Sequence, residues 1–114
     1  MALCEVRSRD EITIVMMPSM IDHIAAQALE KELRELVARE PKGLLCDFSG
    51  TRYLSSSALR TLLIIAKMAK VQRLHFGAFS LTPFVDHILS VSGFASLFSL
   101  YDSEDSAVRA VLRR

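Results

Sequence analysis

The sequence predicts an α/β fold: a mixed, mostly parallel sheet with about four helices. Short apolar or β-branched runs alternate along the chain with longer segments of helical periodicity, which is typical of right-handed crossovers between parallel strands. Two such runs follow each other at the N-terminus across a short polar turn, which adds one antiparallel strand. With 114 residues, 51% of them hydrophobic, the chain is long enough for one core and too short for two. We therefore expect a single domain over residues 1–114, with the order β-β-α-β-α-β-α-β-α.

The first two strands are predicted from alternation and composition. Ala2, Cys4 and Val6 fall on one face of the first segment, and Glu5 and Arg7 fall on the other. This alternation predicts a half-buried strand with the first three residues on its inner face. A polar turn over residues 8–11 and a β-branched run from Ile12 follow. That run is typical of a second strand paired with the first.

The first helix has clear boundaries in the sequence. Pro18 ends the second strand, and Ser19 stands three residues before Asp22, a start similar to a capping box. Pro41 and Gly43 end the helical pattern. Apolar residues recur at helical spacing at Ile21, Ile24, Ala28, Leu29, Leu33, Leu36 and Val37.

The middle of the chain predicts two strands around a buried helix. Residues 44–48 are short and apolar on both faces, which suits a central strand. Residues 58–71 are apolar nearly all round, which indicates a mostly buried helix. Residues 73–79 form a further strand-like run.

The last elements are predicted from their capping residues. Thr82 and Pro83 make an N-cap and first-turn pair, and Gly93 is well placed just past the end of that helix. A short strand over residues 97–101 and a last helix follow. Asp102 or Ser103 is expected to cap that helix.

This order of elements places two loops together. If the second and third strands are parallel, their carboxyl ends emerge at the same edge of the sheet, where open α/β sheets bind their ligands. The loops at that edge are residues 16–20 and 49–58. The second contains three consecutive serines, Ser55, Ser56 and Ser57. One serine is a common N-cap residue at the start of a helix, but three consecutive serines are slightly more than capping requires.

Composition and charge argue against several classes of protein. The net charge of +1 leaves no unbalanced basic stripe for nucleic acid. No apolar run approaches the ~18 residues of a membrane span, and the N-terminus has no signal-peptide block. We therefore expect a cytoplasmic protein without membrane insertion. Cys4 and Cys46 then read as reduced core residues, with a disulfide between neighbouring strands as the alternative.

The sequence shows no signature of catalysis or of metal binding. His23, His75 and His87 have no ligand-like spacing with each other or with the cysteines. His75 is expected at the core or edge of a strand, and the other two on solvated helix faces. The serines lack the flanking glycines of a nucleophile elbow, and no phosphate-binding loop occurs. We expect a binding module that is not an enzyme and needs no cofactor or metal.

The stretch from Asp47 to Leu63 resembles the signature of the STAS domain family, which includes bacterial anti-sigma-factor antagonists. The usual form is D-L-S-G-V-x-F-I-D-S-S-G-L-x-x-L-L, and this chain reads D-F-S-G-T-R-Y-L-S-S-S-A-L-R-T-L-L. The end of the chain, from Ser90, also resembles the family's typical ending. The resemblance therefore covers nearly the whole chain and implies a STAS-type fold.

The resemblance also implies a function. The family's phosphoacceptor precedes the glycine of the motif, which places it at Ser57, with Ser56 as the alternative. The implied partner is an anti-sigma factor that is also a serine kinase of the histidine-kinase-like ATPase fold. The unmodified antagonist binds this kinase, the phosphorylated form releases it, and a PP2C-type phosphatase resets it. The expected partner-binding residues are Met17, Ser19, Met20, Ser55, Ser56, Ala58, Leu59 and Arg60.

Two positions depart from the family's pattern, and two other functions remain open. Ser55 stands in place of the motif's acid, and Ala58 in place of its glycine. These departures favour a non-switching scaffold subunit of a lipid-transport or stress-signalling complex as the first alternative. A small-ligand or nucleotide sensor that uses the same sheet edge is the second alternative.

Overall fold

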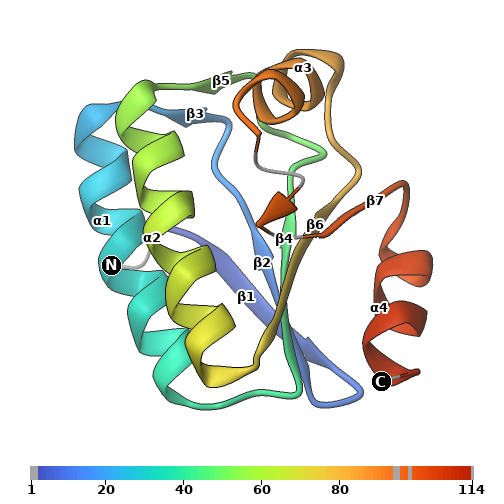
Figure 1. Cartoon of the computed structure of the whole chain (residues 1–114). Helices are drawn as coiled ribbons and strands as arrows, with labels where there is room; N and C mark the ends of the chain where they lie inside the picture. Colours follow the sequence, from blue (N-terminus) through green and yellow to red (C-terminus); the bar gives the residue numbers. More distant parts are fainter. Residues whose placement is uncertain (1–2, 94–95, 98, 114) are drawn as a thin grey trace.

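The computed structural model describes residues 3–93, 96–97 and 99–113, and its main sheet is mixed as predicted. Five strands lie in the order β1-β2-β4-β6-β7 (Figure 1). β1 pairs antiparallel with β2, and the other neighbouring pairs are parallel. The strands are β1 (Glu5–Arg9), β2 (Ile12–Met16), β4 (Gly43–Asp47), β6 (His75–Phe79) and β7 (Ser99–Tyr101).

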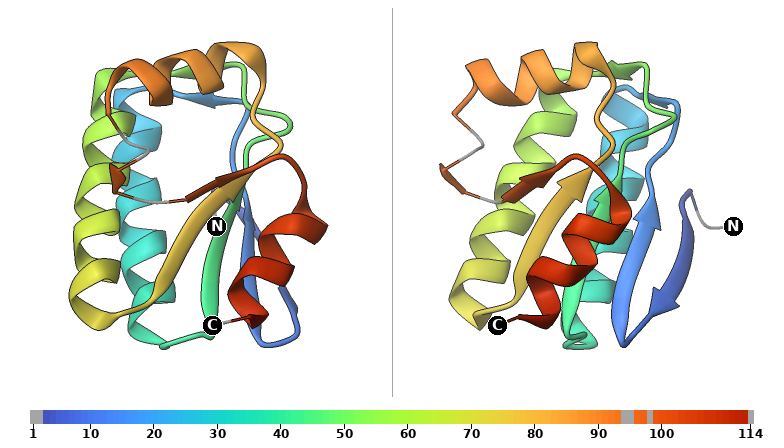
Figure 2. Two further views of the ribbon diagram at one scale, coloured as in Figure 1. Left: turned by 45° about the vertical axis from the view of Figure 1, so that its right-hand side comes forward. Right: turned by 90° about the vertical axis from the view of Figure 1, so that its right-hand side faces the viewer.

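Helices cover both faces of this sheet, and one helix lies across its upper edge. α1 and α2 run side by side on one face, and α4 packs on the other (Figure 2). α3 lies beyond the carboxyl ends of the parallel strands, at the top of Figure 1. The helices are α1 (His23–Ala38), α2 (Ser56–Gln72), α3 (Pro83–Val91) and α4 (Glu104–Leu112). The prediction of about four helices is confirmed.

The sheet divides the core into two clusters, because successive strand residues point to opposite faces. Leu44 and Cys46 belong to the larger cluster under α1 and α2. Leu45 belongs to the smaller cluster, which packs against Ala107 and Val111 of α4. β4 is therefore buried on both faces, as predicted from the apolar residues on both sides of this run.

A second, two-stranded sheet was not predicted. β3 (Met20–Ile21) pairs in parallel with β5 (Tyr53–Leu54) just before the two helices begin. This pairing keeps the chain extended past Ser19, so the predicted capping role of Ser19 is wrong. The N-cap of α1 is Asp22, which accepts a hydrogen bond from the Ala25 N–H at 2.8 Å.

Several predicted burials near the N-terminus are also corrected. Cys4 is buried but precedes β1, whereas Val6 is exposed, so β1 is not half-buried. Among the strands that the structure describes, β1 lies at the edge of the sheet and pairs on one side only, with β2. The turn is also tighter than predicted: Arg9 pairs with Ile12, which leaves two turn residues at positive φ. Ala2 lies outside the described residues.

The capping predictions for the later helices are confirmed. Thr82 caps α3 with Pro83 in its first turn, and Gly93 follows that helix at φ 79°. Ser103, rather than Asp102, caps α4. The predicted strand over residues 97–101 is confirmed for 99–101, and residue 98 lies outside the described part of the chain. The predicted helix over 58–71 begins two residues earlier than expected.

Both cysteines are free and buried, so the alternative of a disulfide is wrong. Burial, together with the nearby Glu32 carboxylate, raises the pKa of the Cys4 thiol to about 12. Burial also raises the pKa of Cys46, which lies fully inside the core. None of the helices formed by the described residues is long and apolar enough to cross a membrane.

Candidate functional site

The two loops predicted to meet at the sheet edge do so through hydrogen bonds. The Thr51 hydroxyl donates to the Pro18 carbonyl at 2.8 Å, and the Arg52 N–H donates to the Ser19 carbonyl at 2.7 Å. Further along both segments, the Ser55 N–H donates to the Ile21 carbonyl at 2.9 Å. The loop after β2 and the loop after β4 therefore form one surface, from which both α1 and α2 begin.

The three serines divide into one capping residue and two first-turn residues. Ser55 is the N-cap of α2, and its Oγ atom accepts a hydrogen bond from the Ala58 N–H at 3.1 Å. Ser56 and Ser57 occupy the first two helical positions, where Ser56 is exposed and Ser57 is half-buried. No acidic residue lies in the first turn of α2, so no carboxylate offsets the positive end of the helix dipole there. Capping accounts for Ser55 alone.

His23, which sequence reasoning assigned to a solvated helix face, contacts Ser57. Its Nδ1 atom lies 2.8 Å from the Ser57 Oγ atom, and its Nε2 atom lies 3.4 Å from Gln27 Nε2. His23 is exposed, but its side chain is not free of protein contacts. The contact arises because the parallel pairing of β3 with β5 starts α1 and α2 at the same level. No local pattern in the sequence signals it.

Two residues expected to contact a partner are instead part of the core. Met17 is 2% exposed, whereas its neighbour Met16 is 44% exposed, so the prediction that Met17 lies at the surface is wrong. Met17 continues the inward alternation of Val15 and packs in the cluster under α1 and α2. Ala58 is also completely buried, because its methyl group points from the first turn of α2 into the same cluster.

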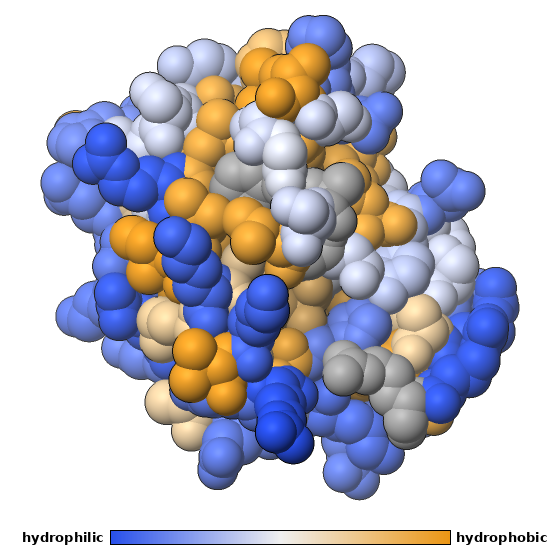
Figure 3. Space-filling model, viewed as in Figure 1, coloured by the Kyte–Doolittle hydropathy of each residue, from blue (hydrophilic) through white to orange (hydrophobic). Residues whose placement is uncertain are grey.

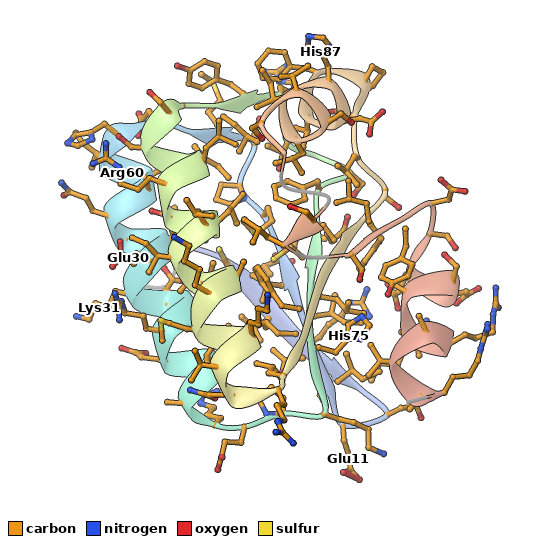
Figure 4. The ribbon with its side chains drawn as sticks, viewed as in Figure 1. Glu11, Glu30, Lys31, Arg60, His75 and His87 are labelled. Atoms are coloured by element: carbon orange, nitrogen blue, oxygen red, sulfur yellow. The ribbon has the colours of Figure 1, made fainter. Side chains whose placement is uncertain are left out.

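The other predicted contact residues lie at the surface around the start of α2. Ser19, Met20, Ser56 and Arg60 are exposed, and Leu59 is half-buried, as is Ser55. Figure 4 shows Arg60 reaching from α2 across the upper part of α1. Their role in binding stays a prediction.

An apolar patch beside the serine tip was not predicted. The rings of Tyr53 and Phe84 stack with centroids 6.4 Å apart, and both side chains are exposed. Met20, the partner of Tyr53 in the β3–β5 ladder, and Ile24 of α1 are exposed as well. Hydrophobic atoms are visible at the top of the molecule over α3 in Figure 3. Ile24 had been assigned to the buried face of its helix, which is wrong. We name Met20, Tyr53 and Phe84 the apolar patch.

The remaining histidines lie on α3 and β6, far apart from each other (Figure 4). His87 is exposed on α3, and His75 of β6 lies beside α4 with its Nε2 atom 2.9 Å from the Tyr101 hydroxyl oxygen (Figure 4). Among the described residues, no group of three or more His, Cys, Asp or Glu side chains is placed to hold a metal ion.

Fold and site together define an α/β domain whose polar, hydroxyl-bearing surface is a helix tip at the carboxyl edge of the sheet. The profile of the STAS domain matches residues 4–107. The chain belongs to the STAS domain family.

Two similar proteins of comparable length are described as anti-sigma factor antagonists. The chain is 28% identical to BtrV of Bordetella bronchiseptica, described as a candidate anti-sigma factor antagonist, over 89% of this chain and 87% of that protein. A crystal structure of an anti-sigma factor antagonist from Mycobacterium paratuberculosis has a TM-score of 0.80 at 28% identity, and the match covers 95% and 92% of the two chains. The Bacillus cell fate determinant SpoIIAA in its phosphorylated form shares the fold, with a TM-score of 0.74 at 13% identity over 95% and 98%.

Proposed function

We propose that this chain is an anti-sigma-factor antagonist that binds its target through the tip of α2 and is released by phosphorylation of Ser57. The observation that carries the proposal is the position of the Ser57 hydroxyl in the first turn of an exposed helix end. Membership of the STAS family and the names of the relatives support the same function. The protein would act by binding alone, without catalysis of its own, in the cytoplasm.

The proposed interface joins the serine tip to the apolar patch. Ser19, Ser56, Leu59 and Arg60 supply polar and mixed contacts at the tip, and the patch supplies exposed apolar area beside it. Aromatic, Met and Arg side chains are the types enriched in protein–protein interfaces. The partner we propose is an anti-sigma factor with serine-kinase activity and a histidine-kinase-like ATPase fold, opposed by a PP2C-type phosphatase.

Charge explains how one modification could release such a partner without unfolding the domain. A phosphoserine adds about −1.5 to −2 charges and three acceptor oxygens. At the start of α2, free N–H groups and the helix dipole stabilise that charge. In a desolvated interface the same charge is unfavourable unless a cation of the partner meets it. Phosphorylation at Ser57 should therefore act on the complex rather than on the fold.

The two departures from the family's motif have different consequences. The Ala58 methyl is buried, so replacing glycine adds no atoms to the proposed binding surface. Ser55 caps α2 in place of the acid but supplies no carboxylate. Compared with the family's motif, the surroundings of Ser57 therefore lack one negative charge, whereas the change at position 58 adds nothing to the proposed binding surface.

The test is phosphorylation by the cognate kinase with ATP, followed by intact-mass measurement. Wild type is expected to gain one phosphate, Ser57→Ala none, and Ser56→Ala one. A modified Ser57→Ala together with an unmodified Ser56→Ala would move the acceptor to Ser56. Loss of kinase binding after phosphorylation, measured by calorimetry, tests release.

The same experiments separate the alternatives. A partner that stays bound under phosphorylating conditions would support the non-switching scaffold. Saturable heat on titration with a nucleotide, in the absence of any protein partner, would support the ligand sensor.

A further inference from the structure

His23 of α1 and Ser57 of α2 form a contact that the proposed switch does not itself require. The two residues are 34 positions apart, yet His23 Nδ1 lies 2.8 Å from Ser57 Oγ. Ser56, the other candidate acceptor, is the exposed neighbour on the same turn, and the described contacts of His23 do not include it. The imidazole therefore distinguishes between two adjacent hydroxyl groups.

The second contact of the ring is with Gln27, whose Nε2 atom lies 3.4 Å from His23 Nε2. The two tautomers of the neutral ring differ in which nitrogen carries the proton, so Nδ1 either donates to the Ser57 oxygen or accepts the hydroxyl proton. The tautomer with the proton on Nδ1, like the doubly protonated ring, presents a donor to Ser57. A phosphate ester is rich in acceptor oxygens and needs a donor directed in this way.

We propose that His23 is a positioning residue for Ser57: its Nδ1–H holds the hydroxyl in the free protein and donates to a phosphate oxygen once Ser57 is phosphorylated. This inference rests on the proposed assignment of Ser57 as the acceptor. His23 thereby partly neutralises the phosphate within the domain and orients it at the tip of α2.

The charged groups around this pair favour an anion. Arg60 on α2, three residues after Ser57, and Arg52 in the loop before β5 are exposed cations near the start of α2. Asp22, which precedes His23 in the chain, is an acid close to this pair, and its carboxylate accepts a hydrogen bond from the Ala25 N–H as the N-cap of α1. His23 is the side chain that directly touches the Ser57 oxygen.

The test places phosphoserine at position 57 during translation, so that no kinase or partner is needed. The second ionisation of the phosphate, followed by ³¹P NMR, is expected at a lower pH in the His23-containing protein than in His23→Ala, by about 0.2 to 0.7 pH units for an exposed charge-assisted contact. His23→Asn keeps a neutral amide near the Nδ1 position and should give an intermediate value. Circular dichroism verifies that each variant is folded.

Phosphoserine at position 56 is the matched control. There, His23→Ala should leave the phosphate titration unchanged, because His23 contacts the neighbouring hydroxyl. Identical titrations of phosphoserine 57 with and without His23 would overturn the inference, and so would an equal shift at position 56. Neither result concerns kinase binding, so the proposed function is tested separately by the intact-mass experiment.

Discussion

Thr51 donates a hydrogen bond from its hydroxyl to the Pro18 carbonyl at 2.8 Å across 33 positions of sequence. Thr51 is completely buried, and its own carbonyl accepts a hydrogen bond from the Thr82 hydroxyl at 2.9 Å. One threonine thus ties the loop after β2 to the loop after β4 and to the start of α3. These are the segments that present the candidate binding surface.

Thr51→Val should lower the free energy of unfolding by about 1–3 kcal/mol, because it removes the donor to the half-buried Pro18 carbonyl. Amide exchange should also accelerate in residues 19–21 and 52–54, where the two loops pair. Urea unfolding and hydrogen exchange measure these effects. Thr51→Ser keeps the hydroxyl and is the control. Equal stability of Thr51→Val and wild type would show that the hydrogen bond is unimportant.

Ser55→Ala should lower the free energy of unfolding by about 0.5–2 kcal/mol, because Ser55 is the N-cap of α2. Ser55→Asp should retain the cap, since a carboxylate also accepts from the helix N–H groups, and it restores the acid of the family's motif. The control is Ser56→Ala, an exposed change expected to stay within about 0.5 kcal/mol of wild type. A larger loss from Ser56→Ala than from Ser55→Ala would contradict the assignment of the cap. Thermal or urea unfolding gives the comparison.

The contact between α4 and β1 should depend on pH, because Glu104 of α4 forms ion pairs with Arg7 and Arg9 of β1. This carboxylate accepts from Arg7, and from Arg9 at 2.7 Å, and these hydrogen bonds lower its pKa to about 2. A pKa lowered in the folded state means that the stabilisation is complete above the unfolded value, about 4.3, and is lost as the pH falls towards 2.

Glu104→Gln should therefore flatten the dependence of Tm on pH between about pH 5 and pH 2. The magnitude should be small, because the interaction is close to solvent. Glu35→Gln, an exposed carboxyl on α1, is the matched control and should leave the slope unchanged. Calorimetry across this range measures the slope. If Tm fell equally steeply with pH in wild type and in Glu104→Gln, the ion pairs of Glu104 would not be the cause of the pH dependence.

Neither cysteine should react with a thiol reagent at pH 8 in the native protein. Burial raises the pKa of both thiols, and the Glu32 carboxylate, which accepts from the Cys4 N–H at 3.1 Å, raises that of Cys4 further. Unfolding in denaturant should release two reactive thiols. Stoichiometric labelling of the folded protein would contradict this burial. Glu32→Gln should increase labelling at Cys4 and leave Cys46 unreactive.

Regular patterns in the sequence were sufficient for the main elements. A short run with apolar residues on both faces, as in residues 44–48, is typical of a strand that is buried on both faces, and the structure places it in the centre of the sheet. Capping residues act over three or four positions, so Thr82 and Ser103 were identified from local sequence. Local chemistry determines these features.

The errors arise where burial depends on distant segments. Alternation required one of Met16 and Met17 to face inward, but which one depends on where α4 ends over the sheet. Ser19 is a good capping residue by its chemistry. It does not cap, because Met20 and Ile21 pair with residues more than thirty positions away.

The sequence by itself determined the order of strands and helices, the family, and the serine-rich helix start, because each depends on residues close together in the chain. Only the tertiary structure decided which hydroxyl of that tip meets His23, which methionine reaches the surface, and which aromatic rings flank the serines. Those relationships depend on the alignment of α1 with α2 through the β3–β5 ladder, which local periodicity does not encode.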